Sequence, residues 1–242
     1  MQSVNLVIAA YGGERRASCN HYDVDRTLYL SALLQNIANL EHGISKIFIV
    51  APPPEFNRDD FNAYLRVLEH SYKGKTELTI VHRKSNNGIS YGAFSDVYQE
   101  FQESGYWLFM EDDYIWAQAN FEQVYINKYE ESGACMVTPM ARPTEPKHAA
   151  VGICFSHSRE LDIICERNGR LPHDAENRSY GEVSQILFSR GFTDAGFDII
   201  DTMCSYRFYM RNHLKGHSPH GDLELPDLIL PVTMRRELHE KS

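Results

Sequence analysis

The chain has 242 residues, of which 43% are apolar and 24% charged, with 15 glycines and 10 prolines. This length suits one large α/β domain or two small ones, and the composition excludes a disordered or collagen-like chain. The formal net charge is −9. Because nucleic-acid binding needs a broad basic surface, we expect no nucleic-acid partner.

Cysteines and targeting signals agree on one compartment. The five cysteines are odd in number and form no C-x-x-C pair, which argues against a disulfide framework or a structural zinc site. The apolar run at 6–10 is too short for a signal peptide, and no stretch approaches the roughly 20 apolar residues of a membrane span. We therefore expect a cytoplasmic protein without a membrane span. The sequence does not indicate an oligomeric state.

The first half of the chain alternates two hydrophobic patterns. Short apolar runs, typical of strands buried on both faces, occur at 4–10, 47–51, 78–81 and 106–110. Apolar residues at helical spacing lie between them, at 30–40, 61–68 and 94–101. Three strand–helix units that lead into a fourth strand predict an α/β fold with a mostly parallel sheet and right-handed crossovers.

The second half is less regular. Its patterns predict helices at 121–129, 161–165 and 183–188 and strands at 135–138 and 151–155. Residues 139–148 contain three prolines and are expected to form a loop. We expect one domain with a regular N-terminal half and a more variable C-terminal half.

Three consecutive carboxylates, Glu111, Asp112 and Asp113, directly follow the predicted strand at 106–110. Ligands of open parallel sheets bind beyond the carboxyl ends of the strands. If the chain stays extended, Glu111 and Asp113 point the same way and Asp112 the opposite way. Two carboxylates on one side suit a hard divalent ion such as Mn²⁺ or Mg²⁺, which neutralises a bound diphosphate. The alternative is a solvated acidic loop.

The segment 83–94, between the third predicted strand and the third predicted helix, contains several small residues. Asn87, Gly88 and Gly92 permit positive φ and a close approach of a ligand to the backbone. The amides at the start of the following helix favour an anion. The alternative is an ordinary loop between a strand and a helix.

Together these segments resemble the GT-A glycosyltransferases, in particular the large inverting group called family 2. The resemblance covers 4–113 and rests on the opening strand at 4–11, the loop at 87–93 and the carboxylates after the fourth strand, where that family carries its D-x-D metal motif. It implies one GT-A domain over the whole chain. Residues up to 113 would bind a nucleoside-diphosphate sugar, and 114–242 would form the acceptor side.

The resemblance also implies the contacts of this donor site. Asp113 would be a direct ligand of Mn²⁺ or Mg²⁺, and Glu111 would reach the ribose or the metal through a bound water. The nucleotide-sugar contacts are expected at Ala9, Ala10, Tyr11, Asn87, Gly88, Gly92, Glu111 and Asp112.

The sequence departs from the family pattern at two points. Many members place an acidic residue after the second strand, where it meets the base, whereas this chain has Pro52, Pro53 and Pro54 followed by Glu55. The family more often has an aspartate where this chain has Glu111. The identity of the base is therefore open.

The catalytic base and a late metal contact are expected in the second half. Inverting transfer needs a carboxylate that deprotonates the acceptor hydroxyl, and Glu182 stands where the family usually carries it, with Asp174 and Glu176 as weaker competitors. The alternative is that Glu182 only stabilises the start of a helix. His220, in a histidine-rich segment, is the candidate third metal contact, and a solvated loop is the alternative.

Three functions are compatible with this sequence. The first is a metal-dependent glycosyltransferase. It would transfer a sugar from a nucleoside-diphosphate sugar to an acceptor hydroxyl, expected to belong to a glycan, with inversion. The second is a nucleotidyltransferase that makes a nucleotide sugar, favoured by the faint glycine-rich, basic pattern at 12–16. The third is a non-catalytic module that binds a nucleotide or sugar. Tyr114 and Trp116 either stack on a sugar or belong to the core, and receive no role.

Overall fold

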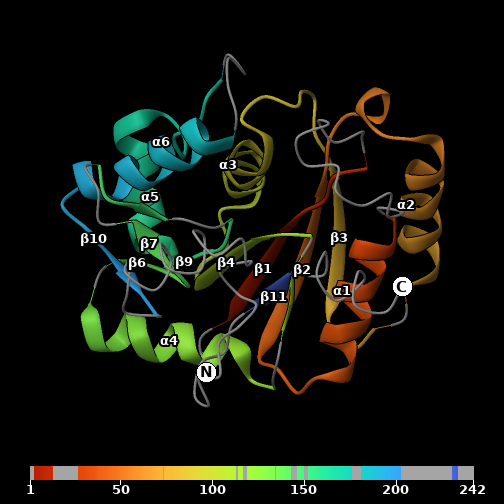
Figure 1. The fold of residues 1–242 in the computed structure, drawn as a ribbon, viewed down its shortest axis with the longest axis horizontal. Helices are drawn as coiled ribbons and strands as arrows, with labels where there is room; N and C mark the ends of the chain where they lie inside the picture. The colour runs from red at the N-terminus through yellow and green to blue at the C-terminus, as the bar shows by residue number, and fades with distance from the viewer. Residues whose placement is uncertain are drawn as a thin grey trace, which may run out of the picture.

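The computed structural model describes residues 3–12, 27–72, 74–112, 114–116, 119–133, 135–142, 146–149, 152–175, 181–202 and 231–233 (Figure 1). Its centre is a seven-stranded sheet with the order β10-β6-β9-β4-β1-β2-β3. The strands are β1 (Val4–Ala9), β2 (Ile44–Ala51), β3 (Glu77–His82), β4 (Tyr106–Glu111), β6 (Cys135–Thr138), β9 (Cys154–His157) and β10 (Asp198–Asp201). Strand β9 pairs antiparallel with both β4 and β6, while the other neighbours in the sheet pair in parallel.

Helices cover both faces of this sheet (Figure 1). They are α1 (Thr27–Asn39), α2 (Asp59–Ser71), α3 (Ile89–Phe101), α4 (Phe121–Ser132), α5 (Ser158–Asn168) and α6 (Gly181–Asp194). Successive side chains of a strand point to opposite faces, so the sheet supplies two cores. One core joins the sheet to α1, α2 and α4, and the other joins it to α3, α5 and α6.

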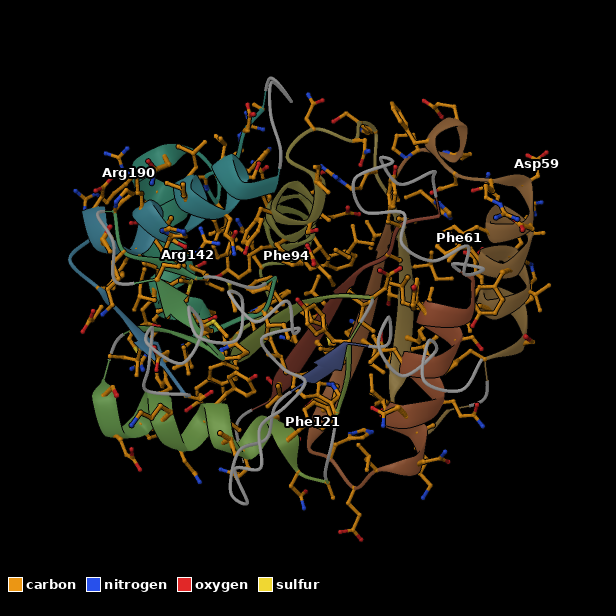
Figure 2. The ribbon with its side chains drawn as sticks, viewed as in Figure 1. Asp59, Phe61, Phe94, Phe121, Arg142 and Arg190 are labelled. Atoms are coloured by element: carbon orange, nitrogen blue, oxygen red, sulfur yellow. The ribbon has the colours of Figure 1, made fainter. Side chains whose placement is uncertain are left out.

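Aromatic side chains fix the helices against the sheet. Phe61 of α2, Phe94 of α3 and Phe121 of α4, labelled in Figure 2, are at most 1% exposed. The Phe94 ring lies 5.1 Å from that of Phe109 on β4, in a tilted arrangement. Burial of such side chains stabilises each helix by roughly 1.5–3 kcal/mol per side chain before entropy is counted.

Two short ladders lie outside the central sheet. Strand β5 (Tyr114–Trp116) pairs antiparallel with β11 (Pro231–Thr233), and β7 (Ala141–Arg142) pairs antiparallel with β8 (His148–Ala149). A 3-10 turn, η2 (Pro54–Phe56), follows β2. In the part of the chain that the structure describes, no helix is long and apolar enough to cross a membrane.

The predicted elements of the first half are confirmed, with small changes at their ends. In the second half the segment at 139–148 is not only a loop, because β7 and β8 form within it and reach Ala149. The backbone amide of Ala149 donates to Ser189 Oγ of α6 at 3.1 Å, so tertiary packing overrides the prolines. The strand predicted at 151–155 lies instead at β9, and the four-residue β10 was not predicted.

Candidate functional site

The strand order places a topological switch between β1 and β4. The chain leaves β1 towards β2 and β3 and later returns to pair β4 with the other side of β1. Ligands of open α/β sheets bind in the crevice beyond the carboxyl ends of the strands at such a point. Ala9 and Glu111, the last residues of β1 and β4, are partners in the register of this pair.

A pocket opens at the carboxyl ends of β1, β2 and β3, against the start of α3. Its lining residues are Ala9, Ala10, Tyr11, Val50, Pro52, Arg83, Asn86, Ile89, Ser90 and Ala93. Six of them carry aliphatic side chains, and none of these described lining residues is acidic. The pocket has apolar walls with a few polar groups, and its volume is about 20 Å³. It contains Ala9, Ala10 and Tyr11, the three residues of β1 and its end that were predicted as nucleotide contacts.

Arg83 is buried and donates hydrogen bonds to the backbone of the loop before α3. Its side chain is 2% exposed, and Nε donates to Asp96 Oδ2 at 2.7 Å. Nη1 donates to the carbonyl oxygen of Ile89 at 3.0 Å, and Nη2 donates to that of Asn87 at 2.7 Å. A guanidinium presents five N–H groups in a fixed plane, so Arg83 holds two loop carbonyls and one α3 side chain in one geometry.

The two predicted glycines of this loop are both required by its shape. Gly88 has a φ of +72°, a conformation that other residues adopt at a cost. A Cβ at Gly92 would lie 1.9 Å from the carbonyl oxygen of Asn87 and 2.5 Å from Nη2 of Arg83. Ile89 also has a positive φ of 49°, which is unusual for a β-branched residue and marks strain held at this site.

Glu111 and Asp112, the first two carboxylates of the acidic cluster, accept hydrogen bonds from different elements. Ser90 Oγ, on the first turn of α3, donates to Glu111 Oε1 at 2.7 Å. Asp112 is 3% exposed, and its Oδ2 accepts a hydrogen bond from the backbone N–H of Tyr11 at 3.0 Å. Glu111 thus joins β4 to the loop of α3, and Asp112 joins β4 to the end of β1. The alternation predicted for the two residues agrees with these partners.

A histidine from the second half of the chain, His173, packs against the same loop. The ring of His173 stands where a Cβ of Gly88 would be, 2.4 Å from its Cδ2. Its Nδ1 is 3.1 Å from the carbonyl oxygen of Leu171, which assigns the ring proton to Nδ1. Burial is the largest influence on this ring and lowers its pKa below the ordinary value of 6.5. Burial therefore favours the neutral form of the His173 ring.

Tyr91, in the first turn of α3, is 3% exposed. Burial raises its pKa well above 10, with Cys154 and Glu111 acting in the same direction. Its ring lies 5.2 Å from that of Phe188, so it also connects α3 to α6. Tyr91 therefore belongs to the core that α3 and α6 share behind the start of α3.

Several predicted site residues fall outside this description. Asp113 and His220 lie outside the described residues, as does the side chain of Glu182, whose backbone belongs to α6. Among the described residues no group of three metal-ligating side chains occurs. The backbone amide of Asp174, the competing base, donates to Ser184 Oγ in α6 at 3.0 Å.

Tyr114 and Trp116 belong to the core. Trp116 is 2% exposed and stacks on Phe121 with ring centroids 4.2 Å apart. Its backbone N–H donates to Asn36 Oδ1 of α1 at 2.8 Å. Tyr114 is 7% exposed. Neither side chain is presented for stacking on a sugar.

Sequence reasoning gave no role to Arg83, Ser90, Gly152 or His173. Only Arg83 carried a signal, because a charged residue directly after a buried strand needs a partner, which Asp96 supplies. The contacts of the other three join segments that are distant in the sequence.

A seven-stranded, mostly parallel sheet with this switch point and one inserted antiparallel strand is a GT-A-type α/β fold, the fold that glycosyltransferases and nucleotidyltransferases share. No family model and no curated protein sequence matches the chain. The similarity to solved proteins is therefore one of structure.

Three solved structures illustrate this similarity. The mannosyltransferase PcManGT from Pyrobaculum calidifontis, in complex with GDP-Man and Mn²⁺, has a TM-score of 0.55 and 13% identity over 89% of this chain and 61% of its own. TarS 1-349 from S. aureus, in complex with UDP, has a TM-score of 0.55 and 10% identity over 83% of this chain and 58% of its own. CMP:2-keto-3-deoxy-manno-octonic acid synthetase, in complex with CTP, has a TM-score of 0.50 and 11% identity over 83% and 89%. This chain spans about three fifths of the length of the first two.

Proposed function

We propose that this protein is a metal-dependent glycosyltransferase that transfers a sugar from a nucleoside-diphosphate sugar to an acceptor hydroxyl of a glycan, with inversion. The observation that carries the proposal is the continuity of the pocket with the carboxylate cluster. Ser90 lines the pocket and donates to Glu111, so one side chain joins the two parts. A nucleoside in the pocket would have its phosphates directed towards the acidic end of β4.

The lining of the pocket has the chemistry that a nucleoside needs, and its volume of about 20 Å³ means that the pocket would widen to admit one. Its aliphatic walls from β1, β2 and α3 suit the faces of a flat base. Arg83 and Asn86 add polar groups at the end of β3. Because no described lining residue is acidic, we propose that base recognition does not use a carboxylate after β2, where the sequence has prolines.

The donor set fits a hard divalent cation. Glu111 provides carboxylate oxygens beside the pocket, and Asp113 follows two residues later. Oxygen ligands are those that Mg²⁺ and Mn²⁺ prefer. We propose Asp113 and Glu111 as the residues that hold the ion, with His220 as a third contact. When bound, the ion would neutralise the diphosphate leaving group.

Glu182 is the proposed catalytic base. It would take the proton of the acceptor hydroxyl while that oxygen bonds to the anomeric carbon and the bond from this carbon to the diphosphate breaks. Its place at the start of α6 supports this role, since α6 packs on α3 through Phe188 and Tyr91. Attack from the face opposite the leaving group would give inversion.

Ligand-dependent thermal unfolding tests the donor site. Wild type and Asp113→Asn would be melted with UDP, GDP, CDP and dTDP, each with and without Mn²⁺. A diphosphate at about 100 times its Kd stabilises the native state by about 2.7 kcal/mol. We expect a Mn²⁺-dependent stabilisation by one of the four that Asp113→Asn abolishes. The absence of any stabilisation would contradict the proposal.

A second measurement separates the enzymes that share this fold. A glycosyltransferase releases a nucleoside diphosphate from a nucleotide sugar, and a change of anomeric configuration in the product, seen by NMR, reports inversion. A nucleotidyltransferase would instead release pyrophosphate from a nucleoside triphosphate and a sugar phosphate. Diphosphate binding without turnover, with Glu182→Gln indistinguishable from wild type, would identify a non-catalytic binding module.

A further inference from the structure

We propose that Ser90 and Gly152 are positioning residues that together fix the Glu111 carboxylate, and that Gly152 is what allows a glutamate to occupy this place. The inference rests on the proposed function, because it assigns Glu111 to the metal and diphosphate end of the donor site. Neither residue would touch the substrate through its side chain. Both would act through Glu111.

The first contact comes from α3. Ser90 is 9% exposed, and its Oγ lies 2.7 Å from Glu111 Oε1. An ionised carboxylate only accepts hydrogen bonds, so the Ser90 hydroxyl is the donor. The position of Ser90 is itself fixed, because Arg83 Nη1 binds the carbonyl oxygen of the preceding residue, Ile89.

The second contact comes from the segment that leads into β9. A Cβ on Gly152 would lie 2.4 Å from Cδ of Glu111, 2.6 Å from Cγ and 2.7 Å from Oε2. These distances are shorter than a real Cβ contact, so the glutamate occupies the volume that any other side chain at 152 would need. The backbone after Gly152 is held by Thr138 Oγ1, which donates to the carbonyl oxygen of Ile153 at 2.9 Å.

Space is therefore what requires a glycine at 152. An alanine at 152 would displace the Glu111 side chain. This makes Gly152→Ala a clean steric test of the glutamate's position.

The two contacts explain how a long carboxylate is made rigid. A glutamate has one more rotatable bond than an aspartate, so its carboxylate is less defined unless the protein constrains it. Ser90 holds one oxygen, and the close approach of Gly152 defines where Cγ and the second oxygen lie. A ligand fixed in advance binds a metal more tightly than one that must be ordered on binding.

A double-mutant cycle tests this inference. Apparent Mn²⁺ affinity would be measured by calorimetry in the presence of the diphosphate that stabilises wild type, for Gly152→Ala, Glu111→Asp and the double variant. We expect Gly152→Ala to weaken Mn²⁺ binding at least tenfold. In the Glu111→Asp background the same alanine is expected to have little effect, because the shorter side chain vacates the space around Gly152.

A serine pair on the same helix provides the matched control. Ser90→Ala removes the hydroxyl that holds Glu111 and is expected to weaken Mn²⁺ binding three- to tenfold. Ser95 is fully buried on α3, and its Oγ has no hydrogen-bond partner among the described residues. Ser95→Ala is therefore expected to leave Mn²⁺ affinity unchanged. Unfolding of each variant without ligand shows whether the fold is intact.

The outcomes separate this inference from the proposed function. If wild type shows no Mn²⁺-dependent diphosphate binding, the proposed function fails and the positioning role fails with it. If wild type binds but Gly152→Ala and Ser90→Ala bind equally well, only the positioning role is overturned. An equal loss from Gly152→Ala in both backgrounds would also overturn it, because the effect would then not pass through Glu111.

Discussion

The two sides of β4 are built in different ways. On one side lie β1, β2 and β3, parallel strands joined by helices that directly follow them in the chain. On the other side lies β9, an antiparallel strand that is inserted between β4 and β6. The pocket belongs to the first side, but Glu111 receives Ser90 from the first side and approaches Gly152 on the second. The regular half forms the pocket, and the irregular half contributes Gly152 beside Glu111, the carboxylate that Ser90 links to the pocket.

The largest expected effect comes from removing an aromatic ring of β9, on the side of β4 that carries the antiparallel strand. Phe155 of β9 is fully buried, pairs with both Leu108 and Val137, and lies 5.1 Å from the ring of Tyr106. We expect Phe155→Ala to lower the free energy of unfolding by about 3–5 kcal/mol in urea titrations. Phe56→Ala is the control, since Phe56 is 47% exposed and should cost less than about 0.5 kcal/mol. A loss below about 1 kcal/mol for Phe155→Ala would mean that β9 contributes little to holding the halves together.

Arg83→Met tests the side of β4 that carries the parallel strands, where Arg83 holds the loop before α3. It removes the donors of two loop carbonyls and the partner of Asp96, and we expect a loss of about 2–3 kcal/mol in unfolding free energy. Asp96 is 37% exposed, so water can solvate the carboxylate and limit the cost. Metal-dependent diphosphate binding should weaken in parallel. The control is Lys84→Met, because Lys84 is the exposed neighbour of Arg83. This variant should leave the unfolding free energy and the diphosphate binding unchanged. Intact diphosphate binding by Arg83→Met would show that the loop forms without the guanidinium of Arg83.

The pH dependence of stability tests a smaller feature of the antiparallel side. Burial is the main cause that lowers the pKa of His157 below 6.5, and its Nδ1 accepts from the backbone N–H of Arg159 at the start of α5. The native state therefore favours the neutral ring, and its stabilisation is complete above about pH 6.5 and lost as the pH falls through the lowered pKa.

An asparagine can supply the same cap without titrating. We expect the unfolding free energy of His157→Asn to fall less than that of wild type between about pH 7 and pH 5, by up to about 1 kcal/mol. The pKa values of His42 and His173 are lowered as well, chiefly by burial, so part of the dependence should persist. Parallel pH profiles for the two proteins would show that His157 does not contribute.

The smallest expected effect comes from an ion pair at the far edge of the sheet. Lys147 Nζ lies 2.8 Å from Asp198 Oδ1, but the side chains are 38% and 63% exposed. Lys147 lowers the pKa of Asp198 mainly through this hydrogen bond. Because the pair is solvated, Lys147→Met should cost less than about 0.5 kcal/mol, and the difference should vanish in about 1 M salt. A larger, salt-independent loss would indicate that the lysine stem packs on β10.

The fold of the first half could be predicted because its strands are continuous apolar runs separated by amphipathic helices. The run at 106–110 is an example, since both of its faces are covered and every residue is buried. The second half was harder. Strand β9 lies later than the predicted 151–155 because its place depends on pairing with β4 and β6. Strand β10 was missed because its two isoleucines stand between two aspartates and form no longer apolar run.

The candidate site was predictable in its location but not in its details. The glycines of the loop and the strand ends carry local signals, and the structure brings Ala9, Gly88, Gly92 and Glu111 to one edge of the sheet. The contact of Gly152 with Glu111 joins residues about forty positions apart and has no local pattern. The functional roles of these residues and of Asp113, Glu182 and His220 are all predictions.

The late position of β9 in the chain has a consequence for synthesis. Once β4 has been made, its outer edge presents unpaired backbone groups beside Trp107, Leu108 and Phe109, until residues 154–157 arrive to pair with them. At ordinary translation speeds this interval lasts a few seconds. An open apolar edge strand is a template for pairing with other chains. Pairing with β9 removes this template, so we expect the open edge of β4 to be closed only once residues 154–157 have been made.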